Sequence, residues 1–125
     1  MTQTDIYRYW IESSDDAFET MGHLMASGDY QWALFIGHLV IEKLMKAHHI
    51  KKTGNEAPLS HNLVLIAQKG GLELLEEQKD LCADINTFNI NARYEDYKRE
   101  FKAKCTREYA ENYPPTQKAT GFARG

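Results

Sequence analysis

The segment from Asp29 to His49 constrains the fold most strongly, because it reads as a long helix that is apolar on nearly every side. A surface helix keeps one broad polar face, so a helix of this kind is expected at the centre of a bundle or beneath a second subunit. Its polar exceptions fall within one arc of roughly 80° at about 100° per residue. They are His38, Glu42, Lys46 and His49, alongside Phe35. Polar side chains on a buried helix need partners, since unpaired burial costs on the order of a few kcal/mol for each group.

Four further segments have the apolar spacing of three and four residues that indicates helices. They run from Thr4 to about Met25, from an N-cap at Ser60 to Gly70-Gly71, from about Leu72 to the break at Asn89 and Asn91, and from Tyr94 to Tyr113. The buried stripe of the first is predicted to be Ile6, Trp10, Ser13, Ala17, Met21 and Leu24. That of the last is predicted to be Tyr94, Tyr97, Phe101, Cys105 and Tyr109. Gly28 should end the first helix and Asp29 should cap the second, which is expected to end near His49.

These patterns predict an all-α fold, because no segment alternates with the period of two that marks a strand. Helices joined by short turns pack as antiparallel neighbours, so an up-and-down bundle of four to five helices is expected. The bundle should cover residues 1–113, and the tail 114–125 is expected to be disordered because it has little to bury. Trp32 points away from the Tyr30 and Leu34 side of its helix, which suggests that a second copy of the chain covers it as a homodimer.

Composition narrows the classes of function. A formal net charge of −3 provides no global positive field for nucleic acid or a membrane surface, so any contact with RNA would be local. The two cysteines show no metal-ligand spacing, and no apolar run is long enough to span a membrane. We therefore expect a cytoplasmic protein with no membrane association and no cofactor.

Arg93 and Tyr94 are the leading candidates for a ligand contact, at the entry of the last helix. An arginine there can bind a carboxylate or a phosphate through two parallel hydrogen bonds. The alternative is a salt bridge to the next helical turn or to a carboxylate of the second helix. His61, after Ser60, can cap backbone groups or reach a neighbouring helix.

The polar arc of the second helix has three interpretations. His38, Glu42 and Lys46 are spaced by four, so each can contact the next, and a mutually satisfied polar network is favoured. Contact with a nucleotide, which would also involve Lys43, is the second interpretation. A metal site is the weakest, because helical bundles build such sites with a Glu-x-x-His motif that this chain lacks.

No catalytic machinery is evident. Gly70-Gly71 lacks the Lys-Ser/Thr of a phosphate-binding loop. No serine or cysteine can be paired from the sequence with a base and an orienting group.

The run GDYQWALFIGHLVIEKLMKAHHI, followed by Pro58, Ser60-His61, Leu63 and Leu65, resembles the HEPN family of small helical domains. The resemblance continues with Trp10 in the first helix, the Glu42-Lys43 pair, and the phrase FNINARYEDYKREF, and it spans roughly residues 8 to 113. It implies a helical bundle that usually dimerises and is often encoded beside a minimal nucleotidyltransferase, as half of a toxin-antitoxin or similar two-component module.

Some members of that family are metal-independent ribonucleases, which share an arginine followed after four to six residues by a histidine. This chain departs from that pattern, because its last histidine, His61, precedes Arg93. We therefore expect a non-catalytic binding domain that is the partner of a nucleotidyltransferase and can contact nucleotide or RNA. The alternative is a ribonuclease in which Arg93 works with His38 or His61, and a nucleotide sensor is a third interpretation.

Overall fold

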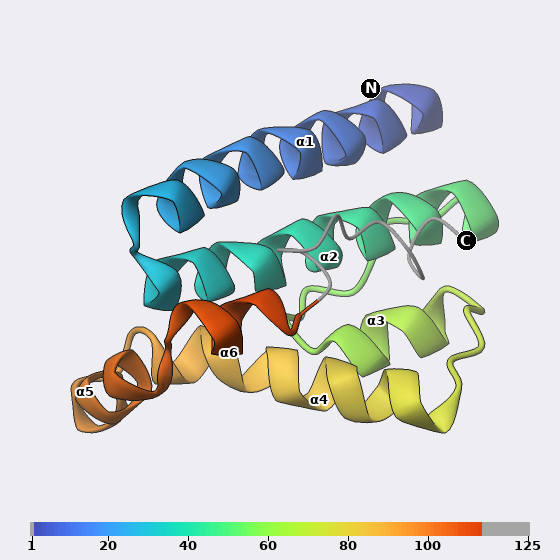
Figure 1. Cartoon of the computed structure of the whole chain (residues 1–125). Coiled ribbons are helices and arrows are strands. Elements are labelled where there is room, and N and C mark those ends of the chain that lie inside the picture. The colour runs from blue at the N-terminus through green and yellow to red at the C-terminus, as the bar shows by residue number, and fades with distance from the viewer. Residues whose placement is uncertain (1, 114–125) are drawn as a thin grey trace.

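Residues 2–113, the part of the chain that this computed structural model describes, contain six α-helices (Figure 1). They are α1 (Gln3–Ser27), α2 (Tyr30–Thr53), α3 (Leu63–Lys69), α4 (Glu76–Asn91), α5 (Glu95–Lys104) and α6 (Arg107–Glu111). No strand occurs among these residues, so the predicted all-α class is confirmed. The tail that was predicted to be disordered lies outside the described residues. No helix between residues 2 and 113 has the length and apolarity needed to cross a membrane.

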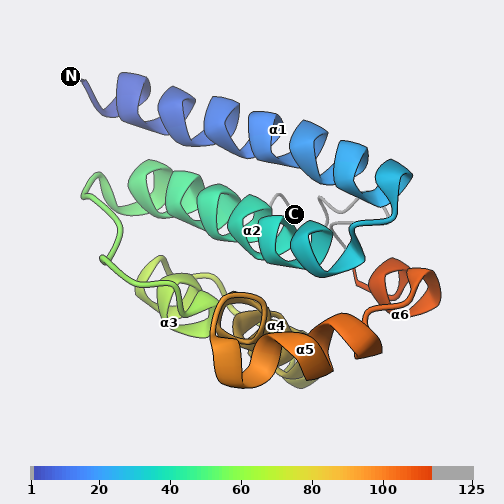
Figure 2. The same cartoon turned by 90° about the vertical axis from the view of Figure 1, so that its left-hand side faces the viewer.

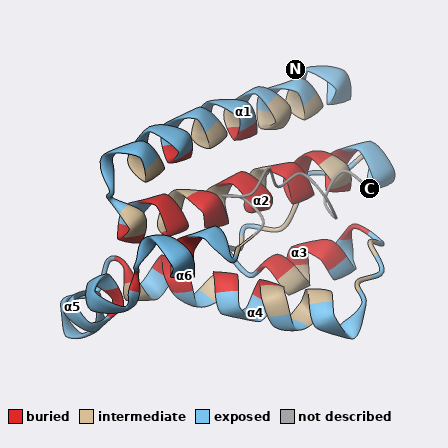
Figure 3. Cartoon of the chain, in the orientation of Figure 1, coloured by how far each residue is buried: buried red, intermediate tan, exposed pale blue. Residues whose placement is uncertain are grey.

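The helix α2 lies in the middle of the molecule, as its apolar composition predicts. Figures 1 and 2 show α1 as an outer layer along one side of α2, with α3 and α4 on the other side and α5 and α6 at one end. Fourteen of the 24 residues of α2 are buried, which places it in contact with neighbours around most of its circumference (Figure 3). Its side chains Leu34, Ile41 and Met45 enter one apolar cluster with Ile66 of α3 and Ile85 of α4.

The helix α1 is less buried than its apolar stripe predicts. Only Ser14 and Met21 are buried along its whole length, and the predicted stripe residues other than Met21 are half-buried. Ser14, rather than Ser13, faces α2, where its hydroxyl donates a hydrogen bond of 3.0 Å to the carbonyl of Val40. The cause is that α1 packs mainly against α2, so both flanks of its stripe remain partly open.

The turn between α1 and α2 agrees with the prediction at Gly28 but not at Asp29. Gly28 adopts the left-handed conformation (φ 84°) that ends α1, a conformation that side chains with a Cβ rarely adopt. Asp29 occupies the N-cap position of α2, but its carboxylate makes no capping bond and instead accepts a hydrogen bond from the Ser27 hydroxyl. At the other end α2 continues one turn beyond the predicted end at His49, to Thr53, before Gly54 ends it with φ 75°.

The starts of α3 and α4 differ from the prediction. Asn62, not Ser60, caps α3, and its side-chain oxygen accepts hydrogen bonds from the backbone of Val64 and Leu65. Ser60 instead accepts a hydrogen bond from the backbone N–H of Asn62, which shapes the turn before the cap. The predicted stop at Gly70 is confirmed, but α4 begins at Glu76 rather than near Leu72.

The segment predicted as one last helix is two helices, α5 and α6. Cys105 leaves the helical conformation (ψ 78°), and the Thr106 hydroxyl then caps α6 by accepting from the backbone of Tyr109. A threonine offers this cap readily, which the apolar spacing alone did not reveal. The predicted stripe is consequently broken: Tyr94 and Tyr97 are 55% and 51% exposed and lie outside the core.

Candidate binding surface along α2

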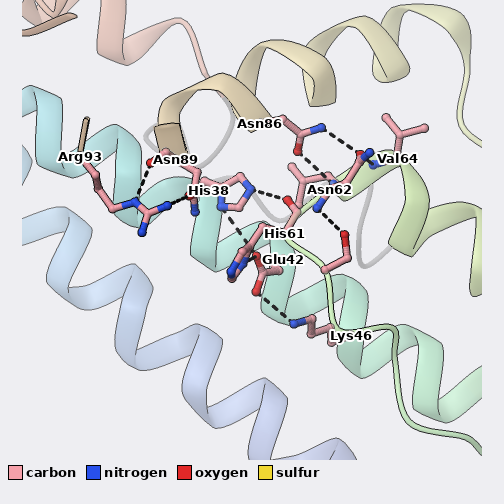
Figure 4. Close-up of polar contacts among 11 residues, drawn as sticks. His38, Glu42, Lys46, His61, Asn62, Val64, Asn86, Asn89 and Arg93 are labelled. Atoms are coloured by element: carbon pink, nitrogen blue, oxygen red, sulfur yellow. Dashed lines mark hydrogen bonds and ion pairs between the residues drawn. The ribbon is translucent and has the colours of Figure 1, made fainter. Parts of the chain in front are cut away.

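The carboxylate of Glu42 is the centre of a polar network between α2 and the loop that precedes α3 (Figure 4). Its Oε1 accepts a hydrogen bond of 2.7 Å from Nδ1 of His61, and its Oε2 accepts one of 3.2 Å from Nζ of Lys46. The side chain is only 6% exposed, so both oxygens depend on these partners for stabilisation. The network that was predicted from the spacing of His38, Glu42 and Lys46 therefore forms, and it includes His61 as well.

His38 is completely buried and ties α2 to the same loop. Its Nε2 donates a hydrogen bond of 2.8 Å to the backbone carbonyl of His61, which fixes the tautomer with the proton on Nε2. Its Nδ1 has no hydrogen-bond partner and lies 3.9 Å from Glu42 Oε1. Burial lowers the pKa of His38, and the bond to the His61 carbonyl and the charge of Glu42 oppose that effect. The ring is therefore neutral near pH 7 and holds the loop in place.

The loop is also fixed from α4, through two asparagines that the sequence reasoning did not identify. Asn86 Nδ2 donates to Asn62 Oδ1, and Asn86 Oδ1 accepts from the backbone of Leu63, both at 3.0 Å. These bonds join the start of α3 to α4 directly after His61. The backbone around His61 is consequently held by His38 on α2 and by Asn86 on α4. The side chain of His61 nevertheless remains 66% exposed.

Trp10 of α1 adds an aromatic surface beside this network. The ammonium groups of Lys43 and Lys46 lie 5.5 and 5.2 Å from the centre of its ring, and the ring of Tyr9 packs against it edge to face. Such contacts between a cation and an indole ring contribute about 0.5–1 kcal/mol each at exposed sites. The predicted candidates Lys43, which is half-buried, and Lys46, which is buried, therefore contact α1 at the edge of its interface with α2.

Arg93 lies at the turn between α4 and α5, over the opposite end of α2. Its Nε donates a hydrogen bond of 2.8 Å to the carbonyl of Asn89, and a terminal nitrogen donates to the Asn89 side chain. The guanidinium lies 5.8 Å from the ring centres of both Phe35 and Tyr94. The predicted salt bridge with a carboxylate is absent from residues 2–113, because an amide four residues earlier takes that place.

The turn that carries Arg93 is fastened to α2 by Gln31. Its side-chain amide donates a hydrogen bond of 3.1 Å to the carbonyl of Ala92, and Gln31 itself is buried. Arg93 and Tyr94, both exposed, are thus presented by a fixed backbone. The spacing from Asn89 to Arg93 is the (i, i+4) signal that could have revealed the partner of the guanidinium.

The candidates divide into two groups along α2. In the first, the Arg93 group, Arg93 contacts Phe35; in the second, the Glu42 network, His61 binds Glu42. Phe35 and Glu42 are seven residues apart, a separation of about 10 Å along the helix axis. No hydrogen bond joins Arg93 to a histidine within the described chain. His49, the fourth member of the predicted arc, belongs to neither group, because its Nδ1 is within 3.1 Å of the Asn55 carbonyl beyond the end of α2.

Other parts of the molecule are less suited to a reactive site. Burial raises the pKa of the thiols of Cys82 and Cys105 to about 11 each, so both are protonated and unreactive near pH 7. A pocket of about 460 Å³ lies between α1 and the far side of α2, lined in part by Tyr7, Asp15 and Lys51. None of the candidate residues lines it. No cluster of three potential metal ligands occurs in the part of the chain that the structure describes.

Fold and site together define a helical domain whose central helix carries a buried polar network, with an exposed arginine and tyrosine at the turn between α4 and α5. Comparison with known protein families identifies it more closely: the HEPN domain model matches residues 7–113, and the chain belongs to the HEPN family. The crystal structure of TT1696 from Thermus thermophilus has a similar fold, with a TM-score of 0.78 over 94% of this chain and 95% of that one, at 20% sequence identity. A comparison with curated proteins finds no match.

Proposed function

We propose that this chain is a non-catalytic HEPN-type binding domain in the cytoplasm, the partner of a nucleotidyltransferase in a two-component, toxin-antitoxin-like module. It acts as a homodimer and contacts the partner, nucleotide or RNA through the open side of α2. Membership of the HEPN family is the basis for proposing the two-component module. The side chains of this chain are the basis for proposing the contact surface. The two groups on that surface are the Arg93 group and the Glu42 network.

The observation that carries the proposal is that the charge of Glu42 is paired with an opposite charge in the folded chain and the charge of Arg93 is not. Glu42 is satisfied internally by Lys46 and His61, which makes it a structural element. Arg93 is bonded only to an amide, so its positive charge is not neutralised by a carboxylate in the described structure. An exposed guanidinium on a fixed turn, flanked by Phe35 and Tyr94, is a common binding anchor for carboxylates, phosphates and aromatic rings.

Capture of a tagged copy from native cell extract, followed by mass spectrometry, tests this function. We expect the wild-type chain to recover a small nucleotidyltransferase and Arg93→Ala to recover several-fold less of it. Arg99→Ala, which removes another exposed arginine close to the same turn, is the matched control and should behave as wild type. Recovery of RNA alone, lost in Arg93→Ala, would overturn the partner function.

A ribonuclease is the second candidate, and one observation favours it. Glu42 holds Nδ1 of His61 and leaves Nε2 of an exposed imidazole free to accept a proton, an arrangement suited to a general base. His38, which is buried and engaged with the loop, is not suited to this role. Arg93 contacts Phe35 and His61 contacts Glu42, two α2 residues about 10 Å apart along the helix axis, so in this candidate a second copy brings an arginine and a histidine together.

Cleavage of RNA by the purified chain separates the two candidates. The binding-domain proposal predicts no cleavage above that of a His61→Asn variant. Cleavage that both His61→Asn and Arg93→Ala abolish, and that persists in the presence of a chelator, would establish the ribonuclease instead.

A further inference from the structure

A cationic and aromatic patch lies where α1, α2 and the loop before α3 meet, and its α2 residue Lys43 is about 12 Å along the helix axis from Phe35, which contacts Arg93. We call it the lysine–tryptophan patch. It consists of Tyr9, Trp10, Lys43, Lys46, Leu59 and His61. Its members come from α1, α2 and the loop before α3, and the contacts described above join all of them except Leu59, which lies two residues before His61.

The patch carries a net positive charge on a chain whose formal net charge is negative. Glu42 is the carboxylate that the described contacts place within it, and one lysine, Lys46, neutralises that charge at 3.2 Å. Lys43 then supplies the surplus positive charge of the patch. A surface of this charge is complementary to carboxylates or phosphates.

The state of Trp10 favours a protein over a nucleic acid. Single-stranded nucleic acids bind by stacking bases on open aromatic faces. Two ammonium groups and the ring of Tyr9 already engage the indole of Trp10, so a base would have to displace one of them.

Leu59 supplies the apolar part of the patch. Its relative exposure is 103%, so its side chain has no packing role in the isolated chain. A partner that buries this leucine gains the hydrophobic contribution of its side chain. Docking of the patch against the same patch of a second copy would place like charges opposite each other, which disfavours that arrangement.

We propose that the lysine–tryptophan patch docks an acidic segment of a protein partner, with a carboxylate on Lys43 and an apolar side chain against Leu59 and Tyr9. This inference rests on the proposed function, for which it names the docking surface and the chemistry of the partner. Lys43 and Lys46 are already held over Trp10, so binding restricts them less than it would restrict free lysines.

Zero-length cross-linking of the captured complex tests the docking surface. A carbodiimide joins a lysine ammonium to a carboxylate only when the two are in contact, and mass spectrometry then identifies the joined residues. We expect Lys43 to be joined to an aspartate or glutamate of the captured nucleotidyltransferase. Lys43→Glu and Leu59→Ser should each lower the amount captured about tenfold, the loss that corresponds to one good contact.

Lys102→Glu, a charge reversal at an exposed lysine of α5, is the matched control and should leave capture unchanged. Replacing the cross-linked carboxylate of the partner by lysine should restore binding to Lys43→Glu, a rescue that a misfolded variant cannot show. Capture that Lys43→Glu and Leu59→Ser leave intact, or cross-links from Lys43 only to a second copy of this chain, would overturn the docking surface while the proposed function stands. RNA bound in place of protein, or no captured protein at all, would overturn both.

Discussion

At the scale of single residues, Glu42 has the most demanding environment in the described structure. Its carboxylate is 6% exposed, and its charge is balanced by an ammonium group that is itself only 10% exposed. Buried ion pairs of this kind add little net stability over an apolar pair, but removing one partner leaves the other charge uncompensated. The network therefore requires Glu42 and Lys46 to be present together, and it fixes the position of the loop that contains His61.

Glu42→Gln should lower the free energy of unfolding by about 3 kcal/mol, because Lys46 loses its counter-charge while the packing volume is kept. Urea denaturation followed by circular dichroism measures the change. The double variant Glu42→Gln/Lys46→Met removes both charges and should recover most of the loss. A single variant within about 0.5 kcal/mol of wild type would show that the pair is not buried in solution.

His38 should make stability depend on pH in a defined direction. Its pKa in the folded chain lies below the ordinary value of 6.5, so below that pH the unfolded chain binds a proton that the folded chain does not. The contribution of His38 is therefore fully present above about pH 6.5 and declines as the pH falls toward the folded pKa. Glu42 and His61 face the same ring, so the comparison must be made against a variant of His38 alone.

We expect the free energy of unfolding of the wild type to fall between about pH 7.5 and about pH 5.5, and to fall less in His38→Gln, whose amide can still donate to the His61 carbonyl. Denaturant titrations at the two pH values measure both slopes. A variant with the same or a steeper slope would contradict the assignment of a neutral, buried His38.

At the scale of helices, an aromatic cluster fixes α5 and α6 against α4. The ring of Phe88 lies 5.6 Å from that of Phe101 and 6.4 Å from that of Tyr109, and it is 2% exposed. The two short helices bury few other side chains fully, so their attachment depends on this cluster.

Phe88→Ala should cost about 3–5 kcal/mol of stability, the usual range for removing a buried phenylalanine. Hydrogen exchange should show the largest loss of protection in α5 and α6. Phe18→Ala on α1, where the side chain is half-buried, is the comparison and should cost less. Equal losses from the two variants would mean that the cluster has no special role in holding the last helices.

The helices also show what could be predicted from the sequence and what could not. Period and apolar content identified the central helix and the all-α class, because burial around most of α2 requires that composition. The cap at Asn62 was missed because Ser60, two residues earlier, is an equally good capping residue, and the cap at Thr106 was missed because the apolar spacing continues across it. Long-range partners such as Asn86 for Asn62 carry no local signal at all.

The contacts within α2 could likewise be predicted from the sequence, and the contacts between distant segments could not. The spacing of four between His38, Glu42 and Lys46 was sufficient to anticipate a network on α2. The participation of His61 depends on the path of a loop, and the contact of Trp10 with two lysines depends on how α1 lies against α2. Arg93 lies at the entry of α5, as its sequence position predicts, but its partner is Asn89 rather than a carboxylate.

At the scale of the whole molecule, the open side of α2 unites these observations. The helices α3 and α4 cover one side of α2 and α1 covers another, and the remaining side presents the Arg93 group and the lysine–tryptophan patch. Trp32, which is 41% exposed and packs edge to face on Phe35, extends the same surface. A domain with this arrangement is suited to holding a partner along α2.

The affinity of this chain for the nucleotidyltransferase that we propose as its partner tests that account most directly. Isothermal titration calorimetry of the two purified proteins should show saturable association, weakened about tenfold or more in Arg93→Ala and unchanged in Arg99→Ala. No association of the folded wild-type chain, or equal affinities for wild type and Arg93→Ala, would contradict the proposed function.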